Sequence, residues 1–396
     1  MSDGNKRYDW GKIRKKCKKL GIFEGYYNPS EEIRWELAKW FVLMSIRNNA
    51  KTTNMVLLGM VLNSMYGTRI EYARLSRDDV TPKRHINFFD TIKSLHYIEK
   101  ITDNQYNDCY YRGGFWYYQR VNYETLEVEE RATEPFMHCF AVTQSTEMKS
   151  NYTSPYGDFL ILDEFIDITK FYRDEFLMLC DCMSTIFRER NDCYVLLLAN
   201  TIDTRSKWFY ELDIVKEVNS MMEGEKKLIH KESDLTNVYV ELMLPRLTET
   251  KKKNIRDFFN FNNPRLNAIT GSCGGWSIKN FPRLPKRSGE HLEYISRDIY
   301  MNNHNFLCRL EIIKHETLGI CVNVVEIRDE VDLSEKIVLV NETPHSNLEF
   351  FGLDNKIGKL IREIYSSAHV FFTSNAAGVT FENFLQEFNV RIRTTE

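Results

Sequence analysis

Three short segments of the chain are continuously apolar, and each is followed directly by a polar residue. They span residues 40–44, 159–162 and 194–199. Short apolar runs without alternation are typical of parallel strands that are buried on both faces. Between the second and third segments, apolar residues recur at helical spacing from Phe176 to Ile186. The pattern predicts a strand, helix, strand unit in a parallel sheet.

A second helix is predicted after the first strand. Apolar residues from Met55 to Met65 mark one helix face, Gly67 is placed to end the helix, and residues 70–75 resume as a strand. We therefore expect the first half of the chain to be an α/β domain with a central, mostly parallel sheet. Ligands of such domains gather at the carboxyl ends of the strands.

The pattern changes after Pro245. Residues 246–290 mix charged residues, Asn, Gly and Pro, which is typical of a linker or lid region. Alternation then returns in FLCRLEIIKHETLGICVNVVEI and KIVLV, and KIGKLIREIYSSAHVFF is interpreted as a helix. These patterns predict three parts: an α/β domain over residues 1–245, a linker over 246–290, and a smaller α/β domain over 291–396.

Composition narrows the class of protein. The chain is 43% hydrophobic and 28% charged, with no run of about eighteen apolar residues, so we expect a soluble cytoplasmic protein without a membrane anchor. Nine scattered cysteines favour reduced thiols over disulfides or zinc. The net charge is only −3, but basic residues crowd the first twenty positions and the segment Lys251–Lys253. Solvated faces and contacts with a phosphate backbone both remain open interpretations.

The segment DFLILDEFID places two carboxylates at the end of a predicted strand. An aspartate in this position, here Asp163, can hold Mg²⁺ beside a nucleotide, and a neighbouring glutamate, here Glu164, can orient or deprotonate the attacking water. By itself an apolar strand that ends in Asp-Glu is common. The assignment therefore depends on a phosphate-binding segment elsewhere in the chain.

Such a segment is present in FVLMSIRNNAKTTNMVLL. In a P-loop, backbone N–H groups wrap the phosphates, the lysine reaches the β- and γ-phosphates, and the next hydroxyl binds Mg²⁺. Lys51 and Thr52 follow a strand and open a helix, as this requires, although Ser45 and Ala50 replace both glycines. Ala takes a positive φ only at a cost. The predicted nucleotide-binding residues are Ser45, Arg47, Asn48, Asn49, Ala50, Lys51, Thr52, Thr53 and, at the end of the third apolar strand, Asn200.

Six stretches in a fixed order carry a resemblance to a known family. They are YYNPS, IEYARLSRDD, TQSTEMKSN, LDEFI, CMSTIFRER and LLLANT. Together they resemble the DNA-packaging (encapsidation) ATPases of φ29-type short-tailed phages, relatives of the terminase large subunits. The resemblance implies a P-loop ATPase domain of the ASCE, RecA-like type. Arg47 matches an arginine common to packaging-motor P-loops, many of which also depart from the full glycine pattern.

The resemblance also implies roles for residues outside the P-loop. Arg77 is implied to contact DNA, Lys149 to assist nucleotide handling between subunits, and Asn200 to act as a sensor. Arg188 is implied to be an arginine finger, with Arg190 as the alternative. Each has a plainer interpretation: the two arginines could balance a helix C-terminus, Lys149 and Arg77 could be surface charges, and Asn200 could cap a turn.

The second half is similar to a reduced ribonuclease H-like domain. HETLGICVNV resembles its hairpin, and FFTSNAAGVTFENFLQEF weakly resembles its final helical region. A two-metal nuclease needs several convergent carboxylates. Glu311 is interpreted as the one acidic residue of the first strand, and no partner carboxylates can be assembled around it. We therefore expect a vestigial nuclease fold that docks to a portal vertex or to a structural RNA.

The family resemblance predicts an ATP- and Mg²⁺-dependent motor subunit that moves double-stranded viral DNA into a preformed procapsid. Its partners would be the DNA, the portal (connector), possible structural packaging RNA, and further copies of itself in a ring, by resemblance a pentamer. It would act in the host cell cytoplasm and transiently at the portal vertex. Two alternatives remain: another P-loop nucleic-acid translocase or helicase, and a non-hydrolysing binding protein with a decayed P-loop.

Overall fold

The structure is a computed structural model. It describes residues 8–45, 50–81, 89–145, 157–166, 172, 174–188, 190–200, 206–230, 237–244, 281–285, 291–304, 306–341, 344, 349–351 and 355–395, without the side chains of 351 and 388–395. The chain divides into two compact units. Among the described residues, the first unit contains 8–166, 174–200 and 216–244, and the second contains 172, 206–215 and everything from 281 onward.

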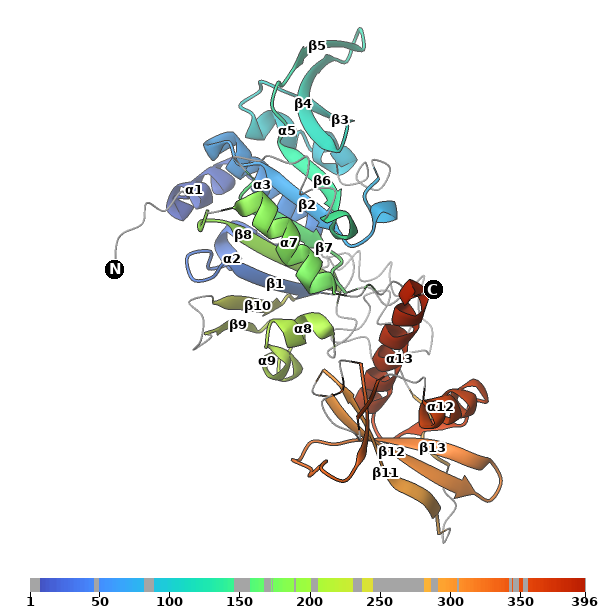
Figure 1. Cartoon of the computed structure of the whole chain (residues 1–396). Coiled ribbons are helices and arrows are strands. Elements are labelled where there is room, and N and C mark those ends of the chain that lie inside the picture. Colours follow the sequence, from blue (N-terminus) through green and yellow to red (C-terminus); the bar gives the residue numbers. More distant parts are fainter. Residues whose placement is uncertain are drawn as a thin grey trace, which may run out of the picture. The chain divides into compact units, whose positions relative to one another are not determined.

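The first unit is built on one large sheet (Figure 1). Its strand order is β3-β4-β6-β2-β7-β8-β1-β10-β9, and β5 pairs with β4. The six consecutive strands from β6 to β10 are parallel to one another, and β9 and the β3–β5 strands are antiparallel additions. The strands are β1 Trp40–Ser45, β2 Ile70–Arg74, β3 Asp108–Arg112, β4 Phe115–Asn122, β5 Glu127–Arg131, β6 Met137–Ala141, β7 Phe159–Asp163, β8 Tyr194–Asn200, β9 Lys226–Ile229 and β10 Val238–Leu242.

Helices cover both faces of this sheet. The connection from β1 through α3 to β2 and the connection from β7 through α7 to β8 run in opposite directions across the strand order. Because such crossovers are right-handed, α3 and α7 must lie on opposite faces. The described helices of this unit are α1 Trp10–Leu20, α2 Pro29–Glu32, α3 Lys51–Tyr66, η1 Arg77–Asp79, α5 Tyr97–Ile101, η2 Val142–Gln144, α7 Glu175–Phe187 and α9 Val215–Asn219.

The central strands are continuously apolar because both of their faces are buried. Every residue of β7 is buried, and so are five of the six residues of β1. One face packs under α1 and α3, where the rings of Trp10 and Trp35 stack with centroids 4.7 Å apart. Helix α3 approaches the sheet closely at Gly59, since a Cβ atom there would lie 2.6 Å from Ile70 Cγ1. The predicted α/β class with a mostly parallel sheet is confirmed.

The second unit contains a six-stranded sheet of order β15-β14-β11-β12-β13-β16. Its core lies on one face, under α12 and α13, and includes Ile361, Phe381 and Phe384. The elements are α8 Lys207–Glu211, β11 Glu293–Asn303, β12 Phe306–His315, β13 Gly319–Glu326, β14 Ile337–Val340, β15 Glu349–Phe351, α12 Lys356–Ser366, β16 Val370–Phe372 and α13 Asn375–Thr395. Two predictions are wrong in detail: the helix expected over 356–372 ends at Ser366, and the first strand of this sheet is β11, so Glu311 lies on the second strand.

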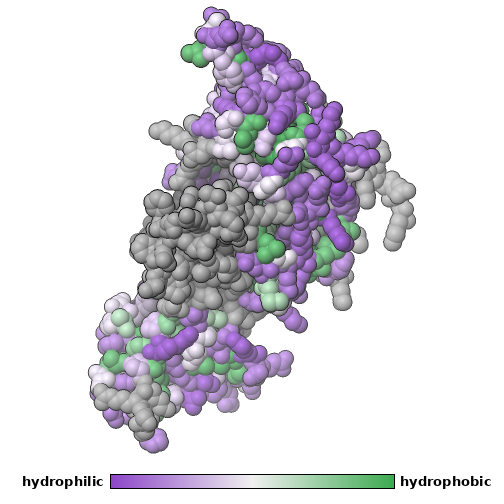
Figure 2. Space-filling model, turned by 180° about the vertical axis from the view of Figure 1, so that it is seen from behind, coloured by the Kyte–Doolittle hydropathy of each residue, from purple (hydrophilic) through white to green (hydrophobic). Residues whose placement is uncertain are grey.

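One face of the described surface is mainly polar. Figure 2 shows one face, on which hydrophilic residues predominate and hydrophobic residues form small separate groups. No helix in the described ranges is both long enough and apolar enough to cross a bilayer.

Candidate active site

Polar side chains from four neighbouring strands meet at the carboxyl edge of the first sheet. Ser45 ends β1, Arg74 ends β2, Asp163 ends β7 and Asn200 ends β8. The register pairs Ser45 with Asn200. It also pairs Ala73 with Leu162, so that Arg74 and Asp163 come next to each other. Since the strands are parallel, one edge of the sheet collects all four side chains.

Lys51 is the first residue of α3 and is only 9% exposed. Its Nζ donates hydrogen bonds to Ser45 Oγ at 2.9 Å and to Asn200 Oδ1 at 3.1 Å. Ser45 and Asn200, two neutral partners, therefore help to hold the ammonium group over the edge between β1 and β8. A phosphate oxygen can replace such partners and gain a charge-assisted bond.

Thr52 and Asp163 face each other across the site. Thr52 Oγ1 donates to Asp163 Oδ1 at 2.9 Å, and the Asp163 side chain is 9% exposed. A hydroxyl and a carboxylate at this separation are both oxygen ligands that suit Mg²⁺. The residues present therefore fit a magnesium ion, with Thr52 and Asp163 as its protein ligands.

Two residues of β2 complete this edge, and neither was predicted from the sequence as a site residue. The Tyr72 hydroxyl donates to Asp163 Oδ2 at 2.8 Å, and burial followed by the Asp163 charge raises the pKa of that phenol well above its ordinary value. Arg74 NH1 lies 3.3 Å from Asp163 Oδ2, and Arg74 NH2 bonds to Glu164 Oε2. Although burial alone would lower it, the neighbouring Tyr72, Asp163 and Glu164 raise the pKa of Arg74 above its ordinary value. One guanidinium group thus spans both carboxylates.

Glu164 is the exposed member of the pair of carboxylates. Its side chain is 51% exposed, and its backbone has a φ of 53°. A non-glycine residue in this left-handed region is strained, and such strain is often found at functional sites. The turn directs the Glu164 side chain away from the end of the strand and toward Arg74.

The start of α3 lies where a phosphate-binding loop requires a helix N-terminus. Its N-cap residue Ala50 has φ 52° and ψ 25°, and among the described residues no side chain forms a cap hydrogen bond. The first N–H groups of an uncapped helix have no intrahelical acceptor and are suited to an anion. Lys51, Thr52 and Thr53 occupy this first turn, whereas Arg47, Asn48 and Asn49 lie outside the described residues. Ala50 therefore adopts the conformation for which glycine is usual.

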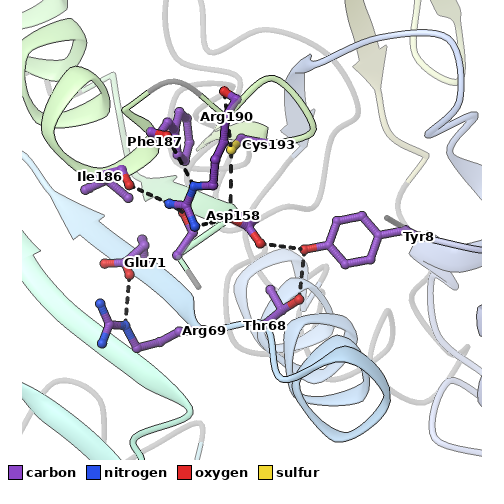
Figure 3. Close-up of polar contacts among 10 residues, drawn as sticks. Tyr8, Thr68, Arg69, Glu71, Asp158, Ile186, Phe187, Arg190 and Cys193 are labelled. Carbon is purple, nitrogen blue, oxygen red and sulfur yellow. Dashed lines mark hydrogen bonds and ion pairs between the residues drawn. The ribbon is translucent and has the colours of Figure 1, made fainter. Parts of the chain in front are cut away.

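The two candidate arginine fingers have different environments, and both lie toward the amino edge of the sheet. Arg190 is held in place: its NH1 lies 2.7 Å from Asp158 Oδ1, and its NH2 donates to Ile186 O and Gly157 O (Figure 3). Asp158 in turn accepts a hydrogen bond from Tyr8 Oη at 3.4 Å. Arg190 therefore closes the C-terminus of α7 and ties it to the start of β7.

Arg188 is exposed, and no described residue forms an ion pair with it. It ends α7, which returns from the carboxyl edge to the amino edge of the sheet. Five residues of β7 separate those edges, a distance of about 16 Å. Arg188 therefore lies at the opposite edge of the sheet from the nucleotide edge of its own chain.

The remaining predicted residues are more peripheral. Arg77 is exposed in η1, just after β2, and Lys149 and the segment 251–253 lie outside the described residues. Helix α1 exposes Lys12, Lys15, Lys18 and Lys19 and buries Ile13 and Cys17 on its inner side.

The order of the parallel strands, the uncapped helix that begins at a lysine, and the carboxylates two strands away define a P-loop nucleoside-triphosphatase fold. Comparison with solved structures finds this fold in phage packaging motors. The structure described as the bacteriophage Phi-29 viral genome packaging motor assembly matches with a TM-score of 0.53 and 15% identity, covering 92% of this chain and 99% of that chain. The Phi-28 gp11 DNA packaging motor matches with a TM-score of 0.52 and 15% identity, covering 91% and 97%.

These matches establish the fold and extend over both units. The fold implied by the sequence resemblance to φ29-type packaging ATPases is thereby confirmed. No protein-family model matches this sequence. The comparison with curated proteins gives no match either.

Proposed function

We propose that this chain is the ATP-hydrolysing subunit of a ring motor that moves double-stranded DNA into a procapsid. The main support is the carboxyl edge of the first sheet, where Lys51, Thr52, Asp163 and Glu164 meet at the start of an uncapped helix. The fold shared with packaging motors over nearly the whole chain supports the choice of substrate.

The residues of this edge fit a nucleoside triphosphate with its magnesium ion. Lys51 and the first N–H groups of α3 would hold the phosphates, and Asn200 would monitor Lys51 across its 3.1 Å hydrogen bond. Thr52 and Asp163 would hold Mg²⁺, which supplies charge neutralisation on the phosphates. Glu164 would accept the proton of the attacking water once its carboxylate leaves Arg74.

Hydrolysis should require more than one subunit. Arg188 lies at the opposite edge of the sheet from the site of its own chain, so it can serve only the site of another copy. An arginine supplied in trans is worth about 10³ to 10⁵ in rate. Arg190 is excluded from this role in our proposal, because Asp158 and the end of α7 already hold it. A ring of copies, a pentamer by resemblance, would arrange each Arg188 toward the next site.

The DNA contact would be electrostatic and independent of sequence. Arg77 is an exposed basic residue of η1, three positions after Arg74, which ends β2 at the nucleotide edge. Binding through such phosphate contacts falls with rising salt. The portal and a structural RNA are further partners in this proposal, as is transient action at the portal vertex in the host cytoplasm.

The deciding experiment measures DNA-stimulated ATP hydrolysis by wild type, Glu164→Gln and Arg188→Ala, alone and mixed. Each variant alone should lose at least about 10³ of the rate. A mixture should regain activity, because the intact Glu164 of one variant then meets the intact Arg188 of the other. Arg112→Ala, which removes an exposed arginine on β3, is the matched control and should retain activity.

Other outcomes assign the protein differently. If mixtures stay inactive, hydrolysis does not depend on a shared site and the ring arrangement is wrong. If wild type neither hydrolyses ATP with DNA nor is stabilised by Mg-ATP, the protein is a binding protein with a decayed P-loop. Translocation on DNA in the absence of a portal would assign it to another class of nucleic-acid motor.

A further inference from the structure

The second unit also collects polar side chains at the carboxyl ends of adjacent parallel strands. Strands β11 and β14 are parallel, and Asn302 pairs with Val340. The next residues along the two strands, Asn303 and Asn341, are therefore neighbours. Asn303 lies on the same face as Met301, and Asn341 on the same face as Leu339, which is the face that α13 covers.

Both asparagines are almost completely buried, each with 2% exposure. Their amide nitrogens are used: Asn303 Nδ2 donates to Thr380 O at 3.4 Å, and Asn341 Nδ2 donates to Glu387 Oε2 at 3.0 Å. Their Oδ1 atoms are buried and accept no hydrogen bond within the described part of the chain. Buried acceptors without a partner are rare in native proteins and call for a water, an ion or a ligand.

A carboxylate from α13 completes the cluster. Glu387 is 9% exposed, and it accepts hydrogen bonds from Asn341 and, at 3.0 Å to each of its oxygens, from His304 Nε2. The cluster thus holds one negative charge and two amide oxygens that lack donors. Three separate elements supply these groups: β11 with the residue that follows it, the end of β14, and α13.

The chemistry of the cluster selects the ligand. The unused atoms of Asn303 and Asn341 are acceptors, so a phosphate, which needs donors, does not fit beside them. Because both asparagines are buried, a large ligand does not fit. Carboxylate and amide oxygens are the ligands preferred by hard divalent cations. We propose that Asn303, Asn341 and Glu387 form a binding site for one divalent cation of the Mg²⁺, Ca²⁺ or Mn²⁺ type. The ion would take the place of His304 at Glu387 and tie α13 to the ends of β11 and β14.

This ion would be structural and would not support nucleolytic cleavage. Two of the three ligand positions are neutral amides, and no group of three or more His, Cys, Asp or Glu residues in the described ranges is placed to hold a metal. A two-metal nuclease requires several convergent carboxylates. Glu311 is the acidic residue considered as a ligand from the sequence, but that carboxylate is already bound by Arg297, Arg309 and Asn323.

The experiment counts bound Mn²⁺ by electron paramagnetic resonance on the full chain without nucleotide. The parent carries Asp163→Asn, which removes the ligand at the nucleotide edge. We expect one bound Mn²⁺ in this parent and none after the further change Glu387→Gln. Glu311→Gln is the matched control, because it alters a buried carboxylate in the same sheet that is saturated by arginines, and it should retain the ion.

A second variant is expected to bind Mn²⁺ more tightly, a result that misfolding could not produce. Asn341→Asp adds a second carboxylate to the cluster and should lower the Mn²⁺ dissociation constant at least tenfold. Absence of Mn²⁺ from the parent, or binding that Glu387→Gln and Asn341→Asp both leave unchanged, would overturn the proposal. Either result would mean that only water occupies the buried amide oxygens.

Discussion

The two units place polar groups at the same topological position and obtain different chemistry. At the carboxyl edge of the first sheet, donors and acceptors meet: the Lys51 ammonium and Thr52 hydroxyl lie beside Asp163, at the start of an uncapped helix. At the carboxyl ends of β11 and β14, the unused asparagine atoms are acceptors. The first arrangement suits an anion together with its metal, and the second suits a cation.

Buried carboxylates show the same contrast. Asp163 Oδ1 is bound by a single neutral hydroxyl, which a metal ion can share. Glu311 is bound by two guanidinium groups and an amide, so no oxygen remains for an ion. The number and charge of the partners that a carboxylate already has decide whether it can serve as a ligand.

Among the changes that compare the two units, the largest effect is expected from removing the Lys51 ammonium group of the first site. Lys51→Met should reduce ATP hydrolysis by at least about 10², since a single preorganised donor to a developing charge contributes 10² to 10³. It should also abolish the thermal stabilisation by Mg-ATP, which is about 2.7 kcal/mol for a ligand at a hundred times its Kd. Lys227→Met is the control, because Lys227 also bonds to a serine hydroxyl, that of Ser220 at 2.7 Å, but on β9. Equal losses in the two variants would contradict the assignment of Lys51.

The next largest effect is expected from removing the Glu311 carboxylate, whose oxygens are already bound by two arginines and an asparagine. Glu311→Leu should destabilise the protein by about 2 kcal/mol, because two arginines lose their buried partner while remaining partly exposed. Urea unfolding measures the change, and the response to Mg-ATP should persist. Glu293→Leu removes an exposed partner of Lys314 in the same sheet, with side chains 67% and 64% exposed, and should cost less than about 0.5 kcal/mol. Similar costs for both variants would show that Glu311 is not an anchor.

The third effect concerns Arg74. In the proposed site its guanidinium would compete with Mg²⁺ for Asp163, so Arg74→Gln should lower the Mg²⁺ concentration for half-maximal nucleotide binding about tenfold, as one charge-assisted hydrogen bond is worth about 1.5 kcal/mol. Nucleotide-binding titrations at varied Mg²⁺ measure this shift. Arg69→Gln is closely matched, because Arg69 is also 12% exposed and bonds to buried Glu71 near the start of β2. An unchanged or raised Mg²⁺ requirement in Arg74→Gln would refute the competition.

The sequence predicted the elements of the first site because burial on both faces leaves a local signature. Strands β1, β7 and β8 are each observed within one residue of their predicted bounds, and α3 ends at Gly67 as expected. Parallel topology then implies that Lys51 and Asp163 share an edge. The roles assigned to these residues stay predictions.

Contacts set by strand register could not be predicted in the same way. Arg74 and Asp163 are 89 positions apart and meet only because β2 lies beside β7. The antiparallel strands β3, β4 and β5 were missed. Of these, β5 is exposed along its whole length and carries no burial pattern. In the second unit, Glu311 was placed on the wrong strand, because most of the first half of β11 is exposed and β11 shows no alternating burial pattern.

The smallest expected effect isolates backbone strain at the first site. Ala50 has φ 52° and Ala368, in the second unit, has φ 58°. Changing either alanine to Gly removes the steric cost of the left-handed conformation, about 1 to 2 kcal/mol. The change also gives the unfolded chain more conformational freedom, which favours unfolding by about 0.4 to 1 kcal/mol. Each variant should therefore be more stable by roughly 0.5 kcal/mol in urea unfolding.

The two alanine variants should differ in nucleotide binding. Ala50→Gly frees the backbone at the start of α3 to fit a phosphate, so it should tighten Mg-ATP binding measured by calorimetry, whereas Ala368→Gly should leave it unchanged. If Ala50→Gly stabilises the protein without affecting Mg-ATP, the strain is structural and α3 does not receive the phosphates. If both variants improve Mg-ATP binding equally, stability alone accounts for the gain, and the difference between the two units lies in their side chains.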